Sequence, residues 1–136
     1  TAIRSFVVFG YFGSQVNCTD GRYLYMHSAS NPEVKLYEYT LMPNRMNCRM
    51  GAELEQASLA QPFGFTKNMP VLKIPASEGT DAVTRTYGTQ LFDLQEDPGQ
   101  QQPIKDEAQE KRLCRAMKQL LEVNEAPGEL FKRMGL

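Results

Sequence analysis

Few side chains in this 136-residue sequence are suited to catalysis. Nucleophilic catalysis requires a nucleophile, a base and a group that orients the base. The only imidazole is His27, which ends a strand-like run beside Ser28 and has no acidic neighbour in the sequence. We therefore interpret His27 as a strand-end histidine or as a substrate contact. The sequence predicts no catalytic residue, and a small hydrolase built on His27 is only a third hypothesis.

Metal and phosphate sites are not predicted either. The acidic stretch at 93–97 lacks the alternating oxygen ligands and the glycine at the sixth position that define a calcium loop. No glycine-rich phosphate-binding motif is present. Cys18, Cys48 and Cys114 are far apart and form no CxxC pair, so we expect free thiols, with one disulfide as the alternative.

Two basic residues stand where they could meet an anion. Arg22 directly follows the Thr19-Asp20-Gly21 turn. Its guanidinium could bind a sulfate or carboxylate in a bidentate manner, or pair with Asp20 or another nearby acid. Lys67 follows an aromatic-rich turn and could direct its ammonium at an anion. The alternative for Lys67 is a surface lysine whose aliphatic stem covers apolar neighbours.

The composition excludes some partners and is typical of a single globular domain spanning 1–136. Hydrophobic residues make up 41% of the chain and charged residues 23%, and the formal net charge is -1. With an isoelectric point near 5.8, the chain has no basic excess, so we expect no nucleic-acid partner. Its apolar runs, such as Phe6–Phe9, are far shorter than the roughly 20 residues of a membrane span, and no membrane partner is expected.

The first 43 residues are rich in strand-forming types. Asp20-Gly21 between two strand-like runs predicts a hairpin with a type I′ turn, in which both central residues have positive φ. Alternation then places Tyr23 and Tyr25 on one face and Arg22 on the other with Leu24 and Met26. The predicted strands of this part cover residues 3–12, 15–18, 22–26 and 34–41.

The rest of the chain predicts a mixture of elements that ends in a helix. A short helix is expected at 52–60, and strands at 71–74, 83–87 and 89–94. Asp106 is the expected N-cap of a long amphipathic helix, with Gln109 completing a capping box. That helix should stop before Pro127, and the chain should end in a short turn. The predicted class is α+β: a small, roughly four-stranded antiparallel sheet packed against the long helix.

Several segments occur in a characteristic order along the chain. These are Phe9–Gly13, Val16–Met26, Leu36–Pro43, Phe65–Lys67 with Val71–Lys73, Gln90–Pro98, Ala126–Glu129 and Arg133–Leu136. The set resembles the C-terminal region of sulfatases of the alkaline-phosphatase superfamily, in particular bacterial arylsulfatase-like proteins. The combination of TDGRY, YEYTLMP and FDL-x-x-DP is more specific than any one of these segments, and the resemblance covers nearly the whole chain.

The resemblance implies that the catalytic apparatus belongs to a part of the protein upstream of Thr1. Sulfatases of this type carry a Cys- or Ser-x-Pro-x-Arg motif that yields formylglycine, and their calcium ligands come from a large N-terminal domain. No cysteine of this chain has proline at the second following position. The resemblance thus implies calcium and formylglycine in the parent enzyme and no cofactor in this chain. Whether the parent is periplasmic, secreted or cytoplasmic stays open.

The resemblance further implies that this part packs on the catalytic domain and forms one wall of the substrate cleft. Arg22, His27 and Lys67 are the residues expected to contact a sulfated small molecule or sugar, and no metal ligand is expected. Arg45 is added because similar proteins have a histidine soon after the TLMP segment. The alternative is a stand-alone binding module derived from a sulfatase. A large apolar patch would favour the first reading, and a polar surface all round would favour the second.

Overall fold

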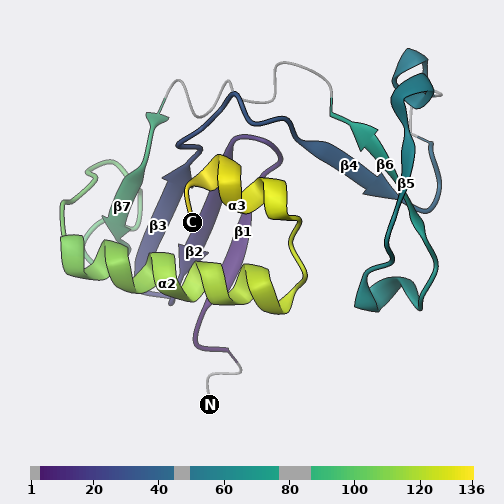
Figure 1. The fold of residues 1–136 in the computed structure, drawn as a ribbon. Helices are drawn as coiled ribbons and strands as arrows, with labels where there is room; N and C mark the ends of the chain where they lie inside the picture. Colours follow the sequence, from purple (N-terminus) through teal and green to yellow (C-terminus); the bar gives the residue numbers. More distant parts are fainter. Residues whose placement is uncertain (1–3, 45–49, 77–86) are drawn as a thin grey trace. The chain divides into compact units, whose positions relative to one another are not determined.

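The computed structural model describes residues 4–44, 50–76 and 87–136 (Figure 1). It confirms the predicted α+β class with a four-stranded antiparallel sheet and a long helix. The chain divides into two compact units, one made of residues 1–34 and 79–136 and the other of residues 35–78.

The sheet of the first unit is built mostly from neighbouring antiparallel strands. Its strands are β1 (Val7–Tyr11), β2 (Gln15–Thr19), β3 (Tyr23–Ser28) and β7 (Gln90–Asp93), in the order β1-β2-β3-β7 (Figure 1). β1 is shorter than the predicted strand at 3–12. Of the strand predicted at 83–87, residues 83–86 lie outside the described residues. Ile104 adds an isolated antiparallel bridge to Leu91 beside the β7 edge.

The hairpin between β2 and β3 forms where it was predicted, but its turn is of another kind. Among Asp20, Gly21 and Arg22, only Gly21 has a positive φ, 93°. The type I′ prediction is therefore wrong. The Asp20 carboxylate stabilises the turn, because its Oδ1 accepts hydrogen bonds from the backbone N–H groups of Arg22 (2.9 Å) and Tyr23 (2.8 Å). An aspartate that bonds its own following backbone stabilises such a turn without a positive φ at the aspartate itself.

The long helix α2 (Glu107–Val123) begins as predicted at Asp106, whose Oδ1 accepts from the N–H groups of Ala108 and Gln109. The Gln109 side chain accepts from Arg112 instead of closing a capping box. The apolar side chains of α2 pack on one face of the sheet. Tyr25 lies on that face, and Tyr23 packs beside it, as strand alternation predicted. The buried core comprises Cys18, Tyr25, Leu91, Leu113, Ala116 and Met117. None of the described helices is long and apolar enough to cross a membrane.

The chain ends in a second helix, α3 (Gly128–Met134), and the predicted short turn is wrong. α2 stops at Val123, before Pro127, as predicted. Pro127 is the N-cap residue of α3, where the missing N–H of proline is harmless. Gly135 closes α3 with a φ of 72°. α3 lies on the same face of the sheet as α2 (Figure 1).

The second unit is a small three-stranded antiparallel sheet with strand order β4-β6-β5. Its strands are β4 (Tyr37–Thr40), β5 (Ser58–Ala60) and β6 (Val71–Pro75), with 3-10 helices η1 (Ala52–Gln56) and η2 (Gly64–Thr66). The helix predicted at 52–60 is therefore wrong in its second half. Residues 58–60 pair with β6 because Leu59 and Ala60 lie opposite Leu72 and Val71, and Val71 is buried.

Candidate functional site

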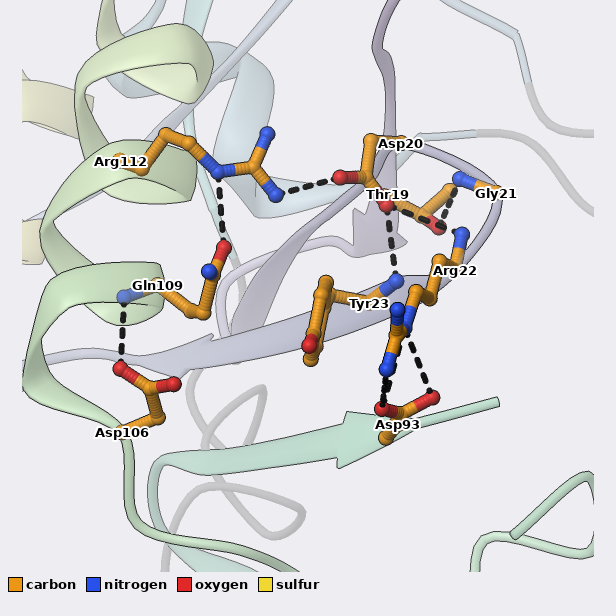
Figure 2. A network of polar contacts seen from close by, with 9 residues as sticks. All are labelled: Thr19, Asp20, Gly21, Arg22, Tyr23, Asp93, Asp106, Gln109 and Arg112. Atoms are coloured by element: carbon orange, nitrogen blue, oxygen red, sulfur yellow. Dashed lines mark hydrogen bonds and ion pairs between the residues drawn. The ribbon is translucent and has the colours of Figure 1, made fainter. Parts of the chain in front are cut away.

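Arg22 and Asp93 form a bidentate ion pair between the β2–β3 turn and the end of β7 (Figure 2). Arg22 donates from Nη2 (2.8 Å) and Nε (3.1 Å) to Asp93 Oδ2, and Oδ1 also accepts from the N–H of Gln95 (3.0 Å). The hydrogen bond from Arg22 holds the pKa of Asp93 below its ordinary value. The cation that was expected to meet a sulfate is thus already paired with a carboxylate, although its side chain stays about half exposed.

A second ion pair joins the same turn to α2. Arg112 donates to Asp20 Oδ2 from Nη2 and to Gln109 Oε1 from Nε (2.8 Å) (Figure 2). Burial alone would raise the pKa of Asp20, but the hydrogen bonds from Arg112 and from two backbone amides lower it below its ordinary value. Both carboxylates of this network are therefore held ionised. A carboxylate fixed in this way stabilises structure and is poorly suited to release or take up a proton near neutral pH.

His27 has both ring nitrogens occupied. Its Nε2 lies 2.8 Å from the carbonyl oxygen of Met134, and its Nδ1 lies 3.0 Å from the hydroxyl of Tyr25. Because a carbonyl oxygen only accepts, Nε2 carries the proton and Nδ1 accepts from Tyr25. Burial raises the pKa of Tyr25 to about 12. His27 thus connects β3 to α3, and neither nitrogen is free to act as a general base.

The other two predicted contacts lie elsewhere in the chain. Lys67 belongs to the second unit, where it follows η2 with a φ of 51° and an exposed side chain. Arg45 lies outside the described residues. Arg22 and His27 share the first unit but stand at opposite ends of β3. The structure therefore does not gather the four predicted residues into one described site.

The described cysteines are free, as predicted. Cys18 is fully buried, and burial raises its pKa to about 11. Burial also raises the pKa of the half-buried Cys114. A thiol with a raised pKa carries little thiolate at neutral pH and is a poor nucleophile or metal ligand. Cys48 lies outside the described residues, and no group of three or more potential metal ligands occurs within the described part of the chain.

Sequence reasoning missed the partners that organise these contacts. Asp93 stood out in the sequence as part of the acidic stretch at 93–97, yet it pairs with Arg22, 71 positions earlier. Arg133 is 5% exposed and donates to the carbonyl oxygens of Gly13 (3.0 Å), Val34 (2.8 Å) and Pro32. The only signal for Asp93 was that it belongs to the FDL segment, and the only signal for Arg133 was its place in the closing segment.

Comparisons with known proteins give no match: no protein-family model, no curated protein sequence and no solved structure matches this chain. Within unit one, the ion pair between Arg22 and Asp93 joins TDGRY to FDL-x-x-DP, two segments on which the sulfatase resemblance rests.

Proposed function

We propose that this chain is the C-terminal part of a sulfatase, a sulfuric ester hydrolase. In this proposal it packs on the catalytic domain and shapes the cleft for a sulfated substrate, while the catalytic domain supplies calcium, formylglycine and the chemistry. The ordered segments that resemble sulfatases motivate the proposal. Arg22, His27, Arg45 and Lys67 are the residues whose effect on substrate binding is to be tested in the whole enzyme.

The observation that carries the proposal is an uncovered apolar row on β1. Val7, Phe9 and Tyr11 are 42%, 48% and 62% exposed. Alternation places them on the face opposite α2, because Val8 between them packs on the core that α2 covers. Adjacent apolar side chains left in water mark an interaction surface. A stand-alone module would instead be expected to cover this row or to replace it with polar residues.

A buried amide supports the same surface. Asn17 pairs with Phe9 in the β1–β2 register, and alternation places its side chain on the face of the apolar row. The residue is 7% exposed, yet its Oδ1 has no hydrogen-bond partner in the part of the chain that the structure describes. An unsatisfied buried acceptor is destabilising by about 1–3 kcal/mol. This unsatisfied acceptor lies on the same face of the sheet as the apolar row.

The test compares this chain with the full product of its reading frame. Both are expressed with a formylglycine-generating enzyme and assayed with calcium and 4-nitrocatechol sulfate. The proposal requires turnover by the long protein and none by the chain alone. Turnover by the chain alone would overturn it and make His27→Ala the next variant. A reading frame that encodes no formylglycine motif would favour the stand-alone module.

A further inference from the structure

Aromatic rings form a continuous row on one face of the second unit. Lys73 Nζ lies 4.0 Å from the ring centre of Tyr37 and 5.6 Å from that of Tyr39, and Tyr39 and Lys73 are register partners. The Tyr39 ring meets Phe63 edge to face, with centroids 5.3 Å apart. The row thus runs from β4 toward η2, and its cation at Lys73 is already engaged by two rings.

The outermost ring of this row is Phe65. It stacks on Phe63 with centroids 5.3 Å apart and an interplanar angle of 2°. Phe65 is nevertheless 76% exposed. Stacked aromatic rings gain from contact with a further ring on the free face, and an exposed phenylalanine supported from behind is a rigid platform for it.

The turn that displays Phe65 is firmly tied to the unit. Thr66 is 5% exposed, and its N–H donates to the carbonyl oxygen of Phe63 (2.9 Å). Its hydroxyl lies 2.8 Å from that oxygen and 3.0 Å from the carbonyl oxygen of Met69, whose own N–H donates back to Thr66. Because Thr66 is held on both sides, the residues that flank it, Phe65 and Lys67, are presented outward from a fixed backbone.

Lys67 differs from Lys73 because its ammonium meets no partner among the described residues. It is exposed and has no ion-pair, hydrogen-bond or ring partner within residues 4–44, 50–76 and 87–136. Lys67 and Asn68 both adopt left-handed backbone conformations, with φ of 51° and 64°. Such conformations are uncommon for residues other than glycine and persist where the surroundings impose them. The turn therefore holds an unpaired cation two positions from an exposed ring.

We propose that Phe65 and Lys67 form a subsite for a ring that carries a sulfate ester. The ring of the ligand stacks on the exposed face of Phe65, and the ammonium of Lys67 pairs with the sulfate. This inference rests on the proposed sulfatase function and deepens it, since it selects ring-bearing sulfates over straight-chain alkyl sulfates. The ring belongs to an aryl sulfate or to a sulfated sugar, because both offer a ring face that can lie on Phe65 and an anion that can meet Lys67.

The experiment is an NMR titration of the ¹⁵N-labelled full chain. The probes are 4-nitrophenyl sulfate, glucose 6-sulfate, hexyl sulfate and inorganic sulfate. We expect amide shifts at residues 63–69 with one or both ring sulfates, and a dissociation constant of about 1 mM, as few contacts provide. Hexyl sulfate and inorganic sulfate should bind at least about threefold more weakly, because neither can stack. The stronger of the two ring probes identifies the substrate class.

Matched variants separate the two contacts. Phe65→Leu should weaken binding of the ring sulfate about three- to tenfold and leave hexyl sulfate unaffected. Lys67→Gln should weaken every sulfate about tenfold, and Lys67→Arg should restore binding. The control is Lys35→Gln, which removes another exposed lysine of the same unit that has no partner among the described residues.

Three outcomes would overturn the subsite: no shifts at residues 63–69, equal binding of inorganic sulfate, or an equal effect of Lys35→Gln and Lys67→Gln. This readout needs neither calcium nor catalytic domain. The titration therefore separates the two proposals. If the long protein is inactive but the ring sulfates still bind this chain, only the sulfatase function is refuted. If the long protein is active but no ring sulfate binds, only the subsite is refuted.

Discussion

At the scale of residues, charges near the β2–β3 turn act in pairs. Arg22 had two candidate partners in the sequence, an external anion or a nearby acid such as Asp20. The structure pairs Arg22 with Asp93 and leaves Asp20 to Arg112. Both carboxylates have lowered pKa values in the folded chain, and this has a consequence for stability at acid pH.

The first prediction is acid destabilisation through these two carboxylates. A depressed folded-state pKa contributes stability that is complete above the ordinary aspartate value of 3.8 and is lost as pH falls through the lower folded value. Urea unfolding between pH 7 and pH 2.5 should therefore show a decline below about pH 4. Asp93→Asn should lower stability at pH 7 and flatten that decline. The control is Glu122→Gln, which removes an exposed acid of α2 and should leave the dependence of stability on pH unchanged. If stability declined as steeply with falling pH in Asp93→Asn as in the unaltered chain, this explanation would be contradicted.

The second prediction concerns His27, which is bonded on both nitrogens. His27→Ala should lower the free energy of unfolding by about 1–3 kcal/mol, because the buried hydroxyl of Tyr25 loses its partner and the Met134 carbonyl keeps only the hydrogen bond from Ser30. Tyr25→Phe removes only the Nδ1 contact and should be destabilising by about 1 kcal/mol. Urea denaturation measures both. Unchanged stability of His27→Ala together with a raised KM in the long protein would instead identify His27 as a substrate contact.

At the scale of elements, local signals worked best where one residue decides a boundary. Asp106 was predicted as the N-cap of α2, and its carboxylate bonds the first turn. The signals failed at 52–60, where helix-forming residues enter a strand. There the pairing with β6 and its buried Val71 outweighs a modest helix propensity.

The third prediction tests the cap of α2. Asp106→Ala should lower the free energy of unfolding by about 1 kcal/mol, since two backbone N–H groups lose their acceptor. Asp106→Asn keeps an acceptor oxygen at the same place and should have less than half that effect. Thermal unfolding followed by circular dichroism measures both variants. Equal losses in the two variants would show that the charge, and not the hydrogen-bonded cap, matters.

At the scale of the whole molecule, the sheet of the first unit is covered on one face and bears an exposed apolar row on the other. α2 buries Cys18, Tyr25 and Leu91 on its side. The row of Val7, Phe9 and Tyr11 gains only part of its possible burial energy in the isolated chain, because about half of its surface stays in water. The full contribution of this row to stability should therefore appear only when another domain covers it.

The fourth prediction follows from this difference. Phe9→Ser should lower the stability of the isolated chain by only about 1 kcal/mol, because about half of the ring already lies in water. In the long protein the same change should lower the melting temperature and sulfatase activity, because the covered row would then hold a polar side chain. Val123→Ser, at a residue 80% exposed on α2, is the matched control and should alter neither protein. Equal behaviour of the two variants in the long protein would refute a role of this row in docking.

The sequence by itself determined the α+β class, the hairpin around Asp20-Gly21, the faces of β3 and the start of α2, because alternation, turn residues and caps act over a few neighbouring residues. It also offered Arg22, His27 and Lys67 as candidates. Only the tertiary structure decided what these side chains meet. Asp93, the partner of Arg22, and Met134, the backbone partner of His27, lie 71 and 107 residues further along the chain, and no local pattern encodes such distances. For the same reason the sequence could not predict that Arg133 is buried or that the ring of Phe65 is exposed, since both depend on which surfaces the fold covers.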